Sequence, residues 1–165
     1  MPTQVKYNSG NNEWYTPSEY IMLAKAVMGS IDLDPASNAI ANEVVQAKQY
    51  FSAEDDGLQR QWHGNVWLNP PYSSNLLKKF AKKLIEELPY IDNAIVLVNN
   101  ATETEWFKTL VSKATAICFP YHRIKFHSPE GKKTLRYRDR LCCTSEIRQN
   151  YLSMPLVQKV GVHYL

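Results

Sequence analysis

Asn65-Val66-Trp67-Leu68-Asn69-Pro70-Pro71-Tyr72 is the stretch of sequence that decides the fold. Its first half is a short, largely apolar run of the kind expected of a buried strand. The two prolines end that strand at once, because a proline has no N–H group to donate to a sheet. The stretch therefore predicts a strand whose carboxyl end carries a rigid polar loop.

Helical and strand patterns alternate on both sides of this stretch. Helices are predicted over residues 16–29, 75–88 and 102–113, and the first and last of these begin with Thr-x-x-Glu capping boxes at Thr16 and Thr102. Strands are predicted over residues 31–34, 94–98 and 116–119, and residues 123–126 fit one more. Residues 38–48 begin as a helix, although parts of 44–51 fit a strand equally well. This order indicates a single α/β domain with a mostly parallel, doubly wound sheet.

Two polar motifs follow predicted strands in this arrangement. Asp34-Pro35 ends the strand at 31–34, and Asn69-Pro70 ends the strand at 65–68. Ligands of doubly wound sheets bind beyond the carboxyl ends of the strands. We therefore expect both motifs to face one crevice.

The composition is that of an ordinary globular chain. It has 165 residues, of which 44% are hydrophobic and 21% are charged, and these values suit one domain with a core of its own. No apolar run is long enough to span a bilayer, and residues 1–12 lack the apolar middle of a signal peptide. The cysteines and histidines show no metal-ligand spacing. We expect a cytoplasmic protein without a membrane segment or a metal.

Positive charge gathers near the end of the chain. Residues 121–148 contain eight Lys or Arg residues and three acidic residues, although the net charge of the whole chain is only +3. Such a surplus fits contact with a phosphate backbone, and a solvated basic region is an equal alternative.

The Asn69-Pro70-Pro71-Tyr72 loop suits chemistry on a planar amine. The nitrogen of such an amine is a poor nucleophile, because its lone pair is delocalised into the ring. Two acceptors held against its N–H groups favour tetrahedral geometry, and the Asn69 side-chain oxygen and the Pro70 carbonyl can serve. Pro70 and Pro71 keep the loop rigid, and Tyr72 offers a flat face for an extruded base. The competing interpretation is a simple strand-ending turn.

Several spaced motifs together carry a family resemblance. From about Trp14 to Gly131, the sequence resembles the small phage-encoded DNA N-6-adenine methyltransferases of the Dam type. The matching segments are Trp14-Tyr15-Thr16-Pro17, residues 31–37, Asp56-Gly57-Leu58, Trp62 and residues 64–72. The resemblance implies a Rossmann-like fold that uses S-adenosylmethionine and methylates adenine in double-stranded DNA. It also implies a phage or prophage gene acting in a bacterial host.

The same resemblance assigns roles to individual residues. Asn69, Pro70, Pro71 and Tyr72 are expected to form the catalytic loop. Cofactor contacts are expected from residues in the first three matching segments: Trp14, Thr16, Pro17, Asp34, Pro35, Ser37 and, more weakly, Asp56. DNA contacts are expected from Arg123 and Lys125.

The last part of the chain departs from the family pattern. We divide the sequence into a polar arm (1–13), a methyltransferase domain (14–133) and an atypical tail (134–165). The family ends with an apolar strand and a Phe-Gly pair, which the tail lacks. Our hypothesis is that the tail is an out-of-frame ending and that this strand is lost; the alternative is plain divergence or a genuine variant C-terminus. The gene's nucleotide sequence distinguishes these two origins.

Two other functions remain open from the sequence. One is a methyltransferase that acts on cytosine N4, an RNA base or a glutamine amide. The other is a nucleic-acid-binding module that has become inactive through its altered tail.

Overall fold

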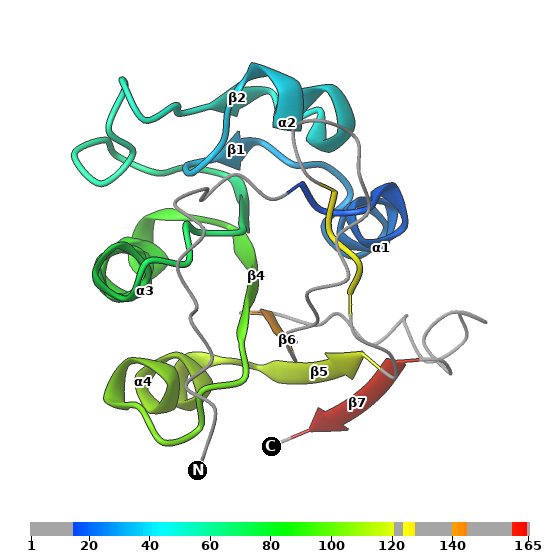
Figure 1. Ribbon diagram of the computed structural model, residues 1–165, viewed down its shortest axis with the longest axis vertical. Helices are drawn as coiled ribbons and strands as arrows, with labels where there is room; N and C mark the ends of the chain where they lie inside the picture. Colours follow the sequence, from blue (N-terminus) through cyan, green and yellow to red (C-terminus); the bar gives the residue numbers. More distant parts are fainter. Residues whose placement is uncertain (1–14, 121–123, 128–139, 145–159, 165) are drawn as a thin grey trace, which may run out of the picture.

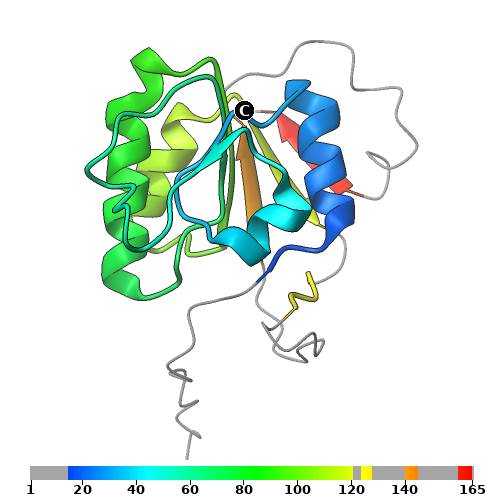
Figure 2. The same ribbon diagram turned by 90° about the horizontal axis from the view of Figure 1, so that it is seen from above.

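A seven-stranded sheet with helices on both faces forms the fold. The computed structural model describes residues 15–120, 124–127, 140–144 and 160–164. Its helices are α1 (Ser18–Met28), α2 (Ala39–Val45), α3 (Ser74–Glu87) and α4 (Glu105–Lys113), with a 3-10 turn η1 (Leu88–Tyr90). Its strands are β1 (Leu33–Asp34), β2 (Gln49–Tyr50), β3 (Asn65–Leu68), β4 (Asn93–Asn99), β5 (Ala116–Pro120), β6 (Arg140–Thr144) and β7 (Val160–Tyr164). Helices α3 and α4 cover one face of the sheet, and α1 covers the other (Figures 1 and 2).

The strand order is β2-β1-β3-β4-β6-β5-β7. Strands β2, β1, β3 and β4 pair in parallel, while β6 pairs antiparallel with both β4 and β5. Strand β5 therefore runs in the same direction as β4, and β7 joins β5 antiparallel at the edge. The predicted α/β class with a mostly parallel sheet is confirmed.

The chain reverses its direction of travel across the sheet between β1 and β3. It passes from β1 to β2 on one side and then returns to place β3 on the other side of β1. A crevice forms outside the carboxyl ends of the strands at such a switch point. Asp34 ends β1 and Leu68 ends β3, so both polar motifs reach this point.

Apolar side chains fill the space between the sheet and each helical layer. Under α3 and α4, the core includes Phe80, Leu84, Val96 and Val98. The α3 side chains Leu77, Phe80 and Leu84 recur at helical spacing, so one face of this helix is buried. Under α1, the core includes Ile21, Trp67 and Leu97, together with Ile124 and Phe126. Among the described residues, no helix has the length and apolar character that crossing a bilayer requires.

Both predicted capping boxes are wrong. Helix α1 follows Pro17 with no side-chain cap, and Thr16 instead accepts a hydrogen bond from Asn69. Helix α4 follows Thr104, whose hydroxyl donates to the carbonyl of Ala101. A threonine hydroxyl bonds wherever the tertiary structure places a partner, so the spacing alone did not fix its role.

The ambiguous stretch at 44–51 contains both a helix end and a strand. Helix α2 is capped by Asn38, whose side-chain oxygen accepts from the Ala41 N–H at 2.8 Å. It ends at Gln46, whose φ of 51° is left-handed, and β2 follows at Gln49. The Asn42 side chain bonds the backbone of Ala47 beyond this turn, which explains the sharp change of direction.

The described part of the expected strand at 123–126 is not a strand. Ile124 and Phe126 are buried and Lys125 is exposed, so the inward and outward alternation is as predicted. The backbone pairs only at His127, which forms an isolated antiparallel bridge with Tyr15. The alternation of buried and exposed side chains therefore reflects the burial of apolar residues and not the pairing of a strand.

The expected loss of the last sheet strand is also wrong. Residues 140–144 form β6 between β4 and β5, and residues 160–164 form β7 at the edge. The expectation rested on the absence of the family's apolar ending. Here the open edges of β4 and β5 supply hydrogen-bond partners for a strand of different sequence.

Gly64 precedes β3 at the end of the sheet away from the crevice, and its φ is 61°. A Cβ at this position would lie 2.6 Å from Asp32 Oδ2 and 2.8 Å from Asp32 Cβ. Asp32 cannot move freely, since its carboxylate accepts from Asn65 N–H at 2.8 Å and pairs with Lys48 at 2.7 Å. We expect Gly64→Ala to lower the free energy of unfolding by about 2 kcal/mol. Urea denaturation measures this, and a change below about 0.5 kcal/mol would contradict the steric account.

Candidate active site

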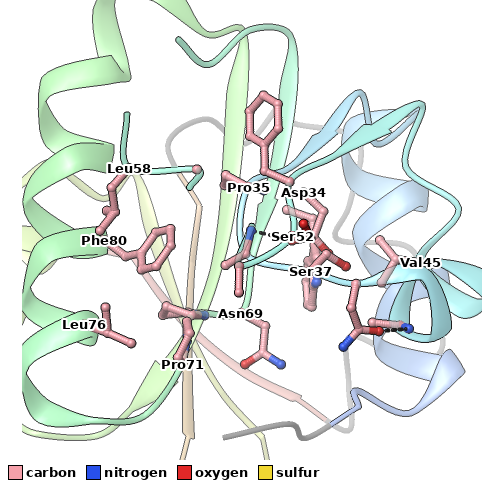
Figure 3. A pocket seen from close by; sticks show the side chains of 18 of the residues that line it. Asp34, Pro35, Ser37, Val45, Ser52, Leu58, Asn69, Pro71, Leu76 and Phe80 are labelled. Atoms are coloured by element: carbon pink, nitrogen blue, oxygen red, sulfur yellow. Dashed lines mark hydrogen bonds between the residues drawn. The ribbon is translucent and has the colours of Figure 1, made fainter. Parts of the chain in front are cut away.

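A cavity of about 430 Å³ lies at the switch point, beyond the ends of β1 and β3. Leu58, Phe80 and Leu76 form one side, Val45 stands on the opposite side, and Asp34 and Asn69 lie between them (Figure 3). The expectation that the Asp34 and Asn69 motifs share a crevice is confirmed. The volume falls in the range of small-molecule and cofactor sites.

The Asn69-Pro70-Pro71-Tyr72 loop directly follows β3 and lines this cavity. The side chain of Asn69 is held at both ends. Its Nδ2 donates to Thr16 Oγ1 at 3.2 Å, and its Oδ1 accepts from the Tyr72 hydroxyl at 2.7 Å. The same hydroxyl lies 2.9 Å from the carbonyl oxygen of Leu97 in the neighbouring strand β4. The loop is therefore fixed by side-chain contacts as well as by its prolines.

The end of β1 supplies a buried carboxylate and a buried hydroxyl. Asp34 is only 3% exposed, and its Oδ1 accepts from the Ala36 N–H at 3.3 Å. Ser37 Oγ is buried, and among the described residues its polar neighbour is the Asp34 carboxyl, whose pKa it helps to lower. Both residues line the cavity. Polar groups in this condition are costly unless a ligand satisfies them.

Burial raises the pKa of the Asp34 carboxyl from 3.8 to about 7, although the Ala36 N–H and the Ser37 hydroxyl partly oppose this rise. A raised carboxyl pKa means that the folded protein holds this proton more tightly than the unfolded chain does. Between about pH 4 and pH 7, Asp34 therefore lowers stability as the pH rises. The resulting loss in the free energy of unfolding is a few kcal/mol, and it is complete above about pH 7.

We therefore expect Asp34→Asn to flatten the pH dependence of stability. The ligand-free variant should be more stable than the ligand-free wild type at pH 8, and this difference should largely vanish at pH 4. Urea unfolding of both proteins at the two pH values is the measurement. A difference that stays constant with pH would show that folding does not change the pKa of Asp34.

The predicted cofactor residues divide into three groups. Thr16, Asp34, Pro35, Ser37 and Asp56 line the cavity. Pro17 does not line it, and instead precedes α1, where its carbonyl accepts from Tyr20 N–H. Trp14 lies outside the described residues.

Asp56 adopts the left-handed conformation at φ 51°, in the loop after β2. Its Oδ1 accepts from the Leu58 N–H at 3.3 Å, which is a local turn contact. Its place on the cavity wall is compatible with the weaker role expected for it.

Several lining residues were not predicted from the sequence. They are mainly the apolar residues of the loop after β2 and of α3, together with Ser52: Phe51, Ser52, Gly57, Leu58, Leu76 and Phe80. One signal was available for Ser52, since it follows a strand end as Asp34 and Asn69 do. That signal required β2 to be recognised, and the pattern over 44–51 left helix and strand equally open.

The structure describes one of the two residues that were predicted to contact DNA. Lys125 is exposed between two buried neighbours, while Arg123 lies outside the described residues. Within the described part of the chain, no cluster of three or more His, Cys, Asp or Glu residues could hold a metal ion.

The comparisons with known proteins agree with one another. The family described as DNA N-6-adenine-methyltransferase (Dam) has a model that matches residues 4–153. The DNA N-6-adenine-methyltransferase of Escherichia phage T1 is 35% identical over 106 residues, which cover 63% of this chain and 42% of that protein. The DNA N-6-adenine-methyltransferase of Haemophilus phage HP1 (strain HP1c1) is 28% identical over 130 residues, which cover 76% of this chain and 73% of that protein.

The family match covers most of the chain, including every cavity-lining residue named above. The match to the phage T1 protein spans less than half of that protein's length. The family model includes the loop at residues 69–72 and the β1 end, which are the two motifs that meet at the cavity. This chain belongs to the DNA N-6-adenine-methyltransferase (Dam) family.

Proposed function

We propose that this protein transfers a methyl group from S-adenosylmethionine to the N6 amine of an adenine in double-stranded DNA. The observation that carries the proposal is the position of the Asn69 amide. It lies at the end of β3, in the same cavity as the buried Asp34 and Ser37 at the end of β1. A hydrogen-bond acceptor for the substrate amine and a set of groups that can bind the cofactor thus share one site.

The architecture supports a Rossmann-like methyltransferase fold. The sheet is doubly wound and mostly parallel, and its switch point lies between β1 and β3. Cofactors with a nucleoside part bind at this place in such sheets. The cavity here lies there and has the size of a cofactor site.

The residues of the cavity fit S-adenosylmethionine chemically. Asp34 is a buried carboxylate that would match a positively charged group, and Ser37 Oγ is a buried hydroxyl beside it that would bond a polar group of the ligand. The apolar side chains of Phe51, Leu58 and Phe80 suit the flat face of a nucleoside base. When bound, the cofactor supplies the methyl group.

The catalytic loop would prepare the amine to receive that group. Asn69 Oδ1 accepts one hydrogen bond from the Tyr72 hydroxyl and has a second lone pair for an adenine N6–H. The Pro70 carbonyl provides the second acceptor in this scheme. Two fixed acceptors draw the amine towards tetrahedral geometry, so that its lone pair becomes available to the methyl group.

Tyr72 and the target base would meet in the same cavity. An adenine inside a duplex is out of reach of such a site, so it must be extruded before reaction. Tyr72 lines the cavity, and its hydroxyl is tied to Asn69 and Leu97. Its ring then stands beside the acceptor, where an extruded base can stack.

Lys125 is our proposed contact to the phosphate backbone. It is exposed in the segment that pairs with Tyr15, directly before Thr16 at the cavity. A lysine here would add affinity without sequence preference, because phosphates carry no base information. Arg123 has the same role in this proposal. The protein would act on DNA in the cytoplasm of the bacterial host of a phage or prophage.

One assay tests the proposed function. The protein is incubated with methyl-labelled S-adenosylmethionine and unmethylated DNA, RNA or protein, and the products are digested and identified. We expect N6-methyladenine from DNA, and we expect it to disappear in Asn69→Ala. Label on cytosine N4, RNA or glutamine would assign another planar amine, and label on no acceptor would leave a binding module without activity.

A further inference from the structure

A small hydrogen-bonded network holds the side chain of Asn69, and its members come from separate parts of the chain. Thr16 stands before α1, Tyr72 lies in the loop after β3, and Leu97 belongs to β4. The Asn69 amide bonds Thr16 at 3.2 Å and Tyr72 at 2.7 Å. The cofactor role that the family resemblance gives Thr16 does not include its contact with the catalytic loop.

Thr16 is itself firmly placed. It is 7% exposed, and its neighbour Tyr15 exchanges two backbone hydrogen bonds with His127, at 2.9 Å and 3.0 Å. On its other side, Pro17 has a fixed φ of −57° and leads directly into α1. The Thr16 hydroxyl is thus held between a backbone bridge and the start of a helix.

An asparagine amide needs such a support to act as an acceptor. Its oxygen and its NH2 group have nearly the same size, so a half-turn of the amide exchanges an acceptor for a donor. A donor in that place could not accept the N–H of a substrate amine. In the structure Asn69 Nδ2 donates to Thr16 Oγ1 and Asn69 Oδ1 accepts from the Tyr72 hydroxyl, so the two contacts together hold the amide with its oxygen end beside Tyr72.

We propose that Thr16 is a positioning residue that orients the Asn69 amide for the substrate amine. The proposal rests on the proposed function, because it concerns the same site and the same reaction. It makes the segment before α1 part of the catalytic arrangement, beside any contact of Thr16 with the cofactor. A site supported in this way reacts faster because its acceptor is in place before the base arrives.

The first test uses Thr16→Val, which keeps the shape of the side chain and removes the hydroxyl. We expect kcat at saturating cofactor to fall about tenfold, while the cofactor Kd changes by less than about threefold. Thr16→Ser restores the hydroxyl and should return kcat to near the wild-type value. Thr109→Val is the matched control, because Thr109 is exposed on α4 and its hydroxyl donates to the Glu105 carbonyl of its own helix.

Two outcomes of this test would overturn the proposal. An unchanged kcat with a raised cofactor Kd would make Thr16 a cofactor contact alone. A loss that Thr16→Ser does not restore would make it a packing residue. Combining Thr16→Val with Asn69→Ala gives a further check, since a residue that acts through Asn69 should add no further loss to that variant.

The second test does not need activity. In ¹⁵N-labelled protein, the side-chain amide signals of Asn69 are identified by their disappearance in Asn69→Ala. We expect them to move in Thr16→Val, to return in Thr16→Ser and to stay in place in Thr109→Val. Signals that do not move in Thr16→Val contradict the contact. If the wild-type protein transfers no methyl group, the proposed function has failed, and these signals still decide whether Thr16 orients Asn69.

Discussion

Gly57→Ala is expected to abolish cofactor binding and to lower the free energy of unfolding by about 3 kcal/mol. An added Cβ would lie 2.0 Å from the carbonyl oxygen of Pro35 and 3.0 Å from its carbonyl carbon. Both are backbone atoms, so no side-chain rotation can relieve the contact. Gly57 and Pro35 both line the cavity, and pushing them apart would therefore change the site itself.

The loop that contains Gly57 has little freedom to move away. The Gly57 carbonyl accepts a hydrogen bond of 2.9 Å from the indole N–H of Trp62, which is fully buried. The backbone N–H of Trp62 in turn donates to the carboxylate of Glu87, which pairs with Lys83 on α3. A shift at Gly57 would disturb this buried chain of contacts, so the strain cannot be confined to one residue.

Two other glycines provide controls for this prediction. Gly29→Ala adds a Cβ with no atom within 4 Å, so it measures only the strain of a φ of 84°. Gly64→Ala adds a collision at the opposite end of the sheet from the cavity. Urea unfolding measures the stability of each variant, and calorimetric titration with S-adenosylmethionine should show loss of cofactor binding only for Gly57→Ala. Equal binding by the Gly57 and Gly64 variants would contradict the account of the site.

The parts of the fold that sequence could predict are those with long apolar runs. Strand β4 is buried along five successive residues, and such a run fits few other places than the middle of a sheet. Strand β3 was predicted with its observed bounds because prolines mark its end. The meeting of Asp34 with Asn69 followed from the predicted strands that contain β1 and β3, since parallel strands end at the same edge.

The parts that sequence could not predict depend on distant partners. Strand β2 has two residues and is defined by pairing rather than by pattern, and the strand predicted over 31–34 is shortened to the two residues of β1. Strand β6 exists because β4 and β5 leave open edges on both sides of it. Thr16 shows the same limit at the site: its spacing to Glu19 suggested a helix cap, while the folded chain brings it to Asn69, 53 positions away.

Asn69→Ala is expected to lower kcat for adenine methylation by about 10² to 10³-fold, with little change in the cofactor Kd. In the proposed mechanism the substitution removes the acceptor that holds the amine, and a placed hydrogen-bond partner of the reacting group has an effect of this size in other enzymes. The Tyr72 hydroxyl keeps a partner in Leu97, so the loop retains a support after the change. Single-turnover rates and cofactor titration of the same preparations measure both quantities.

Asn75→Ala separates this effect from a general effect of removing an asparagine. Asn75 lies in the first turn of α3, three residues beyond Tyr72, and its side chain is exposed and does not line the cavity. We expect this variant to match the wild type in both kcat and Kd. If Asn69→Ala also stayed within about threefold of the wild type, the amine would have to be oriented by backbone carbonyls alone. The network around Asn69 would then serve the stability of the loop, and Thr16→Val should change the melting temperature without changing kcat.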